Sequence, residues 1–470
     1  MDTKKLRQKI LDLAIRGKLV PQDPNDEPAS ILLERIKAEK EKMIQEGKIK
    51  RPRKSSTSDT PHYTHEDAPF EIPSSWESVP VSDLFCLNPK SKITDDTSVG
   101  FIPMSCVDDG FSGNHKFEER IWKEVKKGYC HFQNGDIGIA KISPCFENLK
   151  STIFQNLPNN CGAGTTELVI LRPLGVNVNF YLYFFKSQWY ISEGTKYFKG
   201  VVGQQRVHKE IFTDLQIPLP PLAEQYRIVA EIEKWFKLID TIEQNQTDLK
   251  TAIEQTKSKV LELAIHGKLV PQDPNDEPAS ELLKSINPNA EITCDNGHSR
   301  KYQKYWCNCK IEDVFTVTMG QSPKGESINT SCVGIEFHQG KIQFTDKWLG
   351  ISNFYTSDPK KLANPNALLL CVRAPVGVLN ITDRIICIGR GLCSLKPCPA
   401  LDLNYAYHAL TTYKEIFENK ATGTTFKAIS GDTIKNEFFP LPPLAEQKRI
   451  VQKIEDIFTK LDHIKESLEA

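Results

Sequence analysis

Apolar residues in the middle of the chain follow one another at alternating spacings of four and three, which is the repeat of a coiled-coil helix. The seam runs through Ile228, Ile232, Trp235, Ile239, Ile242, Gln246, Leu249, Ile253, Thr256, Val260 and Leu263. Gln246 and Thr256 interrupt it with polar groups, which would fix the register of the pairing. The pattern predicts one helix of about 43 residues, roughly 65 Å long at about 1.5 Å per residue.

Both ends of the chain carry pieces of the same seam. Ile450, Ile454, Ile457, Leu461, Ile464 and Leu468 match its first half, and Leu6, Ile10 and Leu13 match its end. We therefore expect the terminal segments to form together a second copy of the central unit, cut open, so that the termini meet around a pseudo-two-fold axis. Independent amphipathic surface helices are the alternative.

The segments that flank these helices are duplicated almost letter for letter. LDLAIRGKLVPQDPNDEPAS (11–30) returns at 261–280, and PLPPLAEQYRIV (218–229) returns at 440–451, with few changes. Prolines precede each long helix, Glu224 stands near its positive end, and Gly17 and Gly267 follow a helix where a terminal glycine is expected. The PQDPNDEP stretch must be a turn, and a short second helix is expected after it.

Two longer regions between the duplicated blocks are distant copies of each other. WESVPVSDLF (76–85) aligns with WCNCKIEDVF (306–315), and GDIGIAKISP, ending at Pro144, aligns with NALLLCVRAP, ending at Pro375. TTELVILRP, ending at Pro173, resembles RIICIGRGLCSLKP, ending at Pro397, and the Tyr181/Tyr183 pair matches Tyr405/Tyr407. Short apolar strands mixed with a few helices predict two α/β (α+β mixed) domains that share a fold and differ in their loops.

The duplicated blocks and the paired variable regions resemble the specificity subunit of type I restriction–modification systems. The motifs that carry the resemblance are PLPPLAEQ followed by heptads, GKLVPQDPNDEPAS, and the Trp-led start of each variable region, with PCFENLK (144–150) and RAPVG (373–377) inside them. It implies two globular target-recognition domains separated by long antiparallel coiled-coil helices, pseudo-two-fold and circularly organised.

The resemblance also implies a function and its partners. Each variable domain would read one half of a split site in double-stranded DNA, while the helices set the spacing and dock two methyltransferase subunits, which restriction subunits then join. The chain itself would be non-catalytic, and S-adenosylmethionine, ATP and Mg would be bound by the partners. The expected parts are 1–33 and 440–470 (distal scaffold), 34–66 (basic helix and linker), 67–217 and 302–439 (target-recognition domains), 218–285 (central scaffold) and 286–301 (linker).

Composition changes this picture little. A chain of 470 residues has room for about three domains. The 60 basic residues equal the 60 acidic ones, so net charge neither suggests nor excludes nucleic acid. We expect a cytoplasmic protein, because no long apolar run or signal-peptide core is present and most cysteines lie in apolar runs, as reduced thiols do. Residues 34–54 are basic and predict a solvated helix, with a phosphate-binding arm as the alternative.

Known catalytic motifs are missing from the sequence. It has neither an Asn/Asp-Pro-Pro-aromatic motif for adenine methylation nor a Gly-x-x-x-x-Gly-Lys-Ser/Thr phosphate loop, and no carboxylate–lysine cluster typical of a nuclease. Cys294, His298, Cys307 and Cys309 are the nearest metal candidates, but their spacing matches no common zinc pattern, so we expect no metal. The chain is thus expected to direct chemistry that other proteins perform.

Candidate DNA-reading residues follow from the chemistry of base edges. Arg and Lys bind guanine, Asn and Gln bind adenine, and Ser and Thr bind either, usually from loops. Two loops of the first variable region and their counterparts in the second carry such residues next to glycine or proline. The candidates are Lys141, Ser143, Asn148, Lys150, Gln204, Gln205, Arg206, His208, Arg373, Arg390, Thr424, Thr425 and Lys427. An ordinary solvated loop is the alternative for each.

Two other functions stay open at this point. The chain could be a stand-alone DNA methyltransferase or nuclease whose site has no familiar motif. It could also be a coiled-coil scaffold without DNA specificity. Methyl transfer by the isolated chain distinguishes the first of these, and binding that ignores DNA sequence distinguishes the second.

Overall fold

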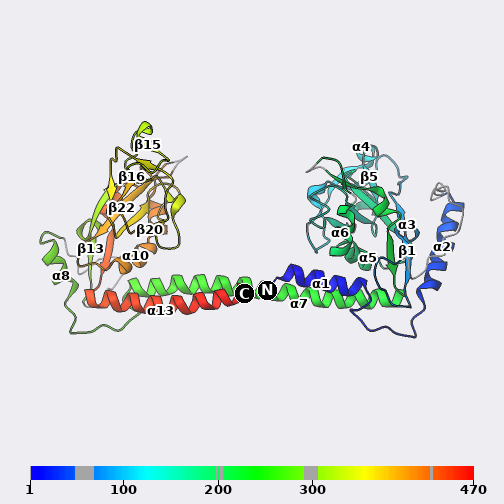
Figure 1. Cartoon of the computed structure of the whole chain (residues 1–470), viewed down its shortest axis with the longest axis horizontal. Coiled ribbons are helices and arrows are strands. Elements are labelled where there is room, and N and C mark those ends of the chain that lie inside the picture. Colours follow the sequence, from blue (N-terminus) through cyan, green and yellow to red (C-terminus); the bar gives the residue numbers. More distant parts are fainter. Residues whose placement is uncertain are drawn as a thin grey trace. The chain divides into compact units, whose positions relative to one another are not determined.

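The computed structural model describes residues 2–47, 68–196, 198–201, 205–290, 305–423 and 427–469. The chain divides into two compact units, Met1–Asn245 and Gln246–Ala470 (Figure 1). The boundary falls within the long helix α7 (Leu222–Ile265), so that each unit contains one part of it. In each unit the sheets lie on one side of a helix pair. We call the sheet-bearing parts the first head (68–219) and the second head (305–441).

Helix α7 confirms the predicted long helix, and it continues for 44 residues without a glycine or proline. The predicted seam is confirmed only in part. Ile228 and Ile239 are buried, but Trp235 and Ile242 are 42% and 38% exposed, and Phe236 is buried in their place. The contact face is turned toward Phe236 because an aromatic loop of the first head packs there, which heptad spacing alone does not reveal.

In the first unit, α7 pairs with the N-terminal helix α1 (Thr3–Ile15). The guanidinium of Arg7 donates to Asp240 at 2.6 Å, whereas Asp26, later in the chain, accepts from Arg227 at 2.5 and 3.0 Å. The residue number rises from 7 to 26 on the N-terminal side while it falls from 240 to 227 on α7, so the two segments are antiparallel, as expected.

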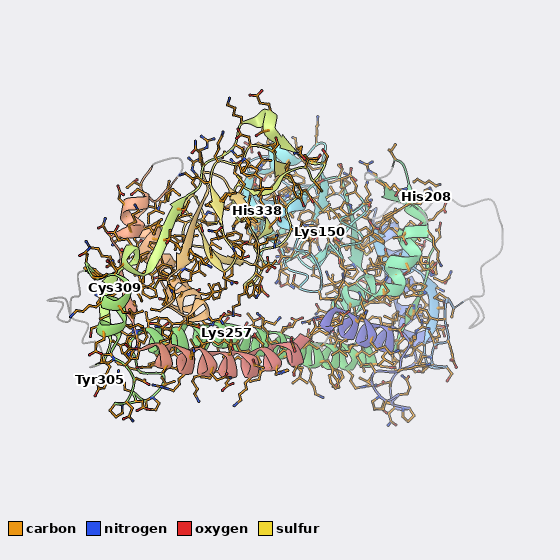
Figure 2. All side chains as sticks on the ribbon, turned by 60° about the vertical axis from the view of Figure 1, so that its left-hand side comes forward. Lys150, His208, Lys257, Tyr305, Cys309 and His338 are labelled. Carbon is orange, nitrogen blue, oxygen red and sulfur yellow. The ribbon has the colours of Figure 1, made fainter. Side chains whose placement is uncertain are left out.

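The second unit repeats this arrangement with helix α13 (Leu444–Glu469) and the later part of α7. Lys257, which Figure 2 labels on the scaffold helices, donates to Asp462 at 2.5 Å. Lys465 donates to Glu254 at 3.1 Å. The partner on α7 moves back from 257 to 254 while the partner on α13 moves forward from 462 to 465, so this pair is antiparallel too. Lys257 and Asp462 correspond in the duplication to Arg7 and Asp240, and the charge pair is therefore kept in both units.

The first unit contains these elements besides α1 and α7. They are α2 (Ala29–Gln45), β1 (Glu77–Pro80), α3 (Val81–Leu84), β2 (Phe85–Leu87), β3 (Ser98–Ile102), β4 (Glu118–Ile121), α4 (Trp122–Val125), β5 (Cys130–Phe132), β6 (Ile137–Ala140), β7 (Ser151–Ile153), β8 (Gly162–Gly164), β9 (Leu168–Pro173), α5 (Val178–Phe185), α6 (Gln188–Lys196), β10 (Phe198–Lys199), β11 (Arg206–Val207) and β12 (Gln216–Leu219).

The second unit adds the following elements to α13. They are α8 (Ala279–Ile286), β13 (Cys307–Lys310), α9 (Ile311–Val314), β14 (Phe315–Met319), β15 (Ile328–Asn329), β16 (Ile335–His338), β17 (Tyr355–Thr356), β18 (Leu362–Ala363), β19 (Ala367–Cys371), β20 (Leu379–Thr382), β21 (Ile386–Ile388), β22 (Leu392–Pro397), α10 (Leu403–Thr411), α11 (Lys414–Lys420), α12 (Gly431–Lys435) and β23 (Phe438–Leu441).

The two heads share a sheet of the same connectivity. Its strand order is β2-β9-β6-β7 in the first head and β14-β22-β19-β20 in the second, and β1–β12 and β13–β23 are equivalent strand pairs. The second sheets differ, with the order β4-β3-β8-β5 in the first head and β15-β17-β16-β21-β18 in the second. The predicted strand equivalences and the mixed α/β class are thus confirmed, and the divergence is concentrated in one sheet and the loops.

Each head is held on its helices by what we call the seat. In the first unit the indole of the buried Trp76 donates to Glu224 at 2.8 Å, and the Tyr181 hydroxyl donates to the carbonyl of Pro218 at 3.0 Å. The side-chain amide of Gln225 joins Asn177, which precedes α5, to the proline turn before α7. Apolar residues of the helices and the head share one core around these bonds.

The second unit has the same seat. The Tyr405 hydroxyl donates to the carbonyl of Pro440 at 2.9 Å, and Gln447 accepts from the backbone of Asp402 at 2.7 Å. Glu446 is fully buried beside Trp306, as Glu224 is beside Trp76. Apart from Asn177 and Asp402, which contribute backbone N–H groups, the residues of the seat lie in segments that the sequence repeats.

Several smaller expectations can be compared with the structure. Gly17 and Gly267 adopt φ of +67° and +64° after their helices, which confirms the glycine caps. Helices α2 and α8 begin directly after the proline-rich turns, as expected. Met1 and Ala470 lie outside the described residues, so the meeting of the termini stays a prediction. Among the helices that are described, none has the length and apolar character needed to cross a membrane.

Candidate nucleic-acid interface

Three segments that are distant in sequence meet at one edge of the first head. The backbone of Lys141, just after β6, accepts from Val207 at 2.8 Å and donates to Glu167 at 2.9 Å. Ser143 donates from its backbone to Gln205 at 2.9 Å. We call these segments, 141–143, 165–167 and 205–207, the junction of the first head. The two loops in which DNA-reading residues were predicted are thus joined directly by main-chain hydrogen bonds.

The second head contains the same junction, made of 372–374, 389–391 and 427–429. Val372 donates to Gly391 and accepts from Ile429, each at 3.0 Å, and Ala374 donates to Lys427 at 3.1 Å. The backbone pattern matches that of the first head bond for bond. The predicted residues Arg373, Arg390 and Lys427 therefore come together from three separate parts of the sequence.

The side chains on the first junction form a partly neutralised group. The guanidinium of Arg206, which is about half exposed, donates to both carboxylate oxygens of Glu167 at 2.8 to 3.2 Å. This hydrogen bonding lowers the pKa of Glu167, and Lys141 acts in the same direction. Ser143 donates to Glu147 at 2.7 Å, and the imidazole of His208 lies 3.3 Å from Glu210.

Asn148 and Lys150 end up in different surroundings although they are neighbours in sequence. The side chain of Asn148 is exposed. The side chain of Lys150 is mostly buried, and its amine donates to the carbonyl of Val107 at 2.7 Å and lies 3.3 Å from Asp109. Lys150 therefore stabilises the head from within, and we do not carry it forward as a DNA contact.

The side chains on the second junction are less neutralised. Arg373, Arg390 and Lys427 are all exposed, and none of them forms a side-chain ion pair with another residue in the described ranges. Three cations at the end of a sheet, without a neighbouring carboxylate bound to them, form a surface suited to phosphate or guanine.

Some predicted residues lie outside the described parts of the chain. These are Gln204, Thr424 and Thr425, together with the metal candidates Cys294 and His298. Cys307 and Cys309 are buried in β13, and burial raises the pKa of the Cys309 thiol well above its usual value. Within the described ranges, no group of three or more His, Cys, Asp or Glu side chains could hold a metal ion.

Sequence reasoning missed the middle segment of the first junction, whereas Arg390 in the middle segment of the second was a candidate. Thr166 and Glu167 were included in an expected strand, but the strand β9 begins only at Leu168. The run of three polar residues between the apolar strands β8 and β9 marks a tight turn, and this signal could have identified Glu167 as a junction residue.

Comparison with known proteins agrees with this architecture. The family described as type I restriction modification DNA specificity domain matches residues 73–251 and 303–470, one match for each head with its following helix. The type I restriction enzyme EcoAI specificity subunit of Escherichia coli is 33% identical over 98% of this chain and 90% of its own length.

Two solved structures share the fold. A chain from the structural study of complex assembly and conformational transition of the type I R-M system has a TM-score of 0.64, with 24% identity over 85% of this chain and 94% of that one. The HsdS subunit from Thermoanaerobacter tengcongensis has a TM-score of 0.56, with 22% identity over 86% and 94%.

The fold and the two junctions define a protein with two DNA specificity domains on a helical scaffold. The chain belongs to the specificity subunits of type I restriction–modification systems. Specificity subunits recognise DNA and are not themselves the catalytic subunits, so the alternative of a stand-alone methyltransferase or nuclease is disfavoured.

Proposed function

We propose that this chain recognises a bipartite site in double-stranded DNA and that each head binds one half of it through its junction. The observation that carries the proposal is that one backbone arrangement occurs in both heads with different side chains. The first junction presents Arg206 and Lys141 beside Glu167, and the second presents Arg373, Arg390 and Lys427. A constant frame with variable donors suits two readers of different sequences.

Helix α7 sets the distance between the two half-sites in this proposal. Its 44 residues correspond to about 66 Å at about 1.5 Å per residue. A helix without glycine or proline keeps its length, so the number of base pairs between the half-sites is fixed by the number of residues in the helix.

The helix pairs dock the partners in this proposal. Two methyltransferase subunits bind the two repeated scaffold surfaces, because equivalent surfaces suit two copies of one protein. Restriction subunits join this core. S-adenosylmethionine, ATP and Mg are then bound by the partners, in the cytoplasm, and the chain described here supplies the address on the DNA.

Binding to DNA duplexes across a salt titration tests the proposal, with the full chain alone and together with its methyltransferase subunits. The site is first located by mapping methylated adenines in the host genome. Scrambling either half of that site should weaken binding, and scrambling the base pairs between the halves should not. Binding that ignores sequence at every salt concentration would contradict it, and so would robust methyl transfer by the isolated chain.

A further inference from the structure

Lys186 is a fully buried lysine that ends helix α5 of the first head. Its amine donates to the carbonyls of Gly110 at 2.6 Å and Leu149 at 2.8 Å. Burial lowers its pKa to about 7, although Asp108 and Asp109 act in the opposite direction. Burying an amine costs free energy that an apolar side chain of the same size would not cost. The hydrogen bonds of Lys186 are therefore the feature of this position to be explained.

The two carbonyls belong to two different loops. Gly110 lies in the bracket loop, which we define as 104–113, and Leu149 lies in the reading loop, 144–150, where Asn148 is exposed. The backbone of Gly110 also donates to the carbonyl of Asn148 at 2.9 Å. Lys150 adds its bonds to the bracket loop, so the two loops form one connected body with Lys186 beneath them.

The bracket loop connects this body to the helix pair of the same unit. The ring of Phe111 packs on Phe236 of α7 with centroids 5.6 Å apart, and the guanidinium of Arg7 lies over both rings. A hollow of about 410 Å³ is lined by Lys4 of α1 and by Glu147 and Asn148 of the reading loop. Phe146 anchors the start of the reading loop in the core of the head, where it packs on Tyr190. The hollow separates the exposed part of the loop from α1, so the bracket loop and Lys186 connect that part to the helix pair.

In the second head the position equivalent to Lys186 is not a lysine. Tyr405 corresponds to Tyr181, and the residue five positions later, equivalent to Lys186, is the fully buried Leu410. There the neighbouring loop is bound by the Tyr407 hydroxyl, which donates to the carbonyl of Asp346 at 2.7 Å. The buried amine is therefore a feature of the first head alone.

We propose that Lys186 is a positioning residue for DNA readout by the first head: it fixes the reading loop on the bracket loop, and thereby on the helix pair, without touching DNA. The proposal rests on the proposed function. Removing the amine takes its donor from the half-buried carbonyl of Gly110 and leaves the buried carbonyl of Leu149 with only the long 3.5 Å bond from Ser151. The reading loop then moves relative to the helices, and selectivity for the first half-site falls while the second half-site is read as before.

The experiment uses the full chain with its methyltransferase subunits and two duplex libraries, each with one half-site randomised. Lys186→Met removes the donors at similar volume, Lys186→Arg restores donors, and Leu410→Met is the matched control in the second head. We expect Lys186→Met to lose about tenfold selectivity in the first half only, the scale of one base contact. Lys186→Arg should recover part of it, and the dependence of binding on salt should not change.

Three outcomes overturn the proposal. Unchanged selectivity in a folded Lys186→Met variant does so, and so does an equal loss in both halves, which would indicate general destabilisation. A smaller salt dependence would mean that Lys186 itself binds phosphate. If Lys186→Met does not fold, Phe111→Ala breaks the same path nearer the surface and must lower first-half selectivity instead. A wild-type complex without any half-site selectivity would contradict the proposed function before either variant is considered.

Discussion

Arg206 donates to both carboxylate oxygens of Glu167 in the first head, at 2.8 to 3.2 Å, between two segments of the junction. Arg206 is about half exposed, and exposed pairs of this kind contribute little to stability because solvent screens them. A DNA phosphate or a guanine edge can therefore compete for the guanidinium. Glu167 orients Arg206 and at the same time restrains it from binding any phosphate that comes near.

The first prediction concerns this restraint. Glu167→Gln should strengthen binding to DNA of any sequence and increase the slope of log affinity against log salt by about one, because one more cation is free. Discrimination in the first half-site should fall, because the arginine is no longer oriented. Salt-titrated binding checks this, with Asp214→Asn, at an exposed carboxylate of the same head, as an equal charge change. Unaltered binding in the Glu167 variant would mean that Arg206 does not face the DNA.

Arg373 gives the second prediction. Arg373→Gln should weaken discrimination in the second half-site by about 1–3 kcal/mol if the guanidinium binds a guanine edge. Binding to duplexes with single substitutions in each half measures this. Lys448→Gln, an exposed lysine on α13, is the control for loss of one positive charge. Equal weakening for all sequences would instead identify Arg373 as a phosphate contact.

The third prediction concerns stability and pH. Burial raises the pKa of Glu224, which accepts from Trp76 and Gln22, so the folded state binds a proton more readily than the unfolded state does. The contribution of this group to stability should therefore fall as pH rises from about 4.5, the usual value, to the raised pKa. Glu224→Gln should remove that dependence.

The free energy of unfolding of the same variant should also be lower than that of the wild type at acidic pH, by about 1–3 kcal/mol. The amide oxygen of glutamine can accept from only one of Trp76 and Gln22, and its NH2 group then faces the other donor. Urea unfolding at several pH values measures both effects. Glu446→Gln is the matched change in the second unit. A Glu224 variant whose stability keeps the wild-type pH dependence would place the titration in another group.

The fourth prediction concerns the length of α7. Four helix-forming residues inserted beside Gln246 add about 6 Å, which equals roughly two base pairs. The preferred gap between the half-sites should lengthen by that amount while both half-site sequences stay the same. Mapping the methylated sites of the variant measures the gap, and a four-residue replacement without insertion is the control. A change in either half-site sequence would contradict the proposal that the heads determine the sequence and α7 determines only the spacing.

The repeated parts of the fold could be predicted from the sequence because the same residue at matching positions of the two copies has the same structural role. Gly17 ends a helix at positive φ, and Tyr181 and Tyr405 occupy equivalent seats, as their alignment indicated. Lys150 was less predictable, because residue type identifies a donor but not the direction in which it points. Its amine binds Val107 inside the head.

The seam and the middle segment of the first junction show the same limit. Trp235 fits the heptad spacing but is largely exposed, because Phe111 from the first head selects Phe236 as the packing face. Glu167 was included at the start of an expected strand, yet a main-chain hydrogen bond from Lys141 places it in the junction. Both features depend on contacts between segments far apart in sequence, which local patterns cannot reveal.

The seat has a consequence for how such proteins change. Tyr181 and Gln225 join head and scaffold through the same atoms as Tyr405 and Gln447. Trp76 and Trp306 are buried at equivalent places, and none of these residues lies on a junction. A head moved from the seat of one unit to the seat of the other would find the same proline carbonyl and the same glutamine side chain there. New DNA specificities can therefore arise by exchange of whole cassettes, with the mechanical frame left untouched.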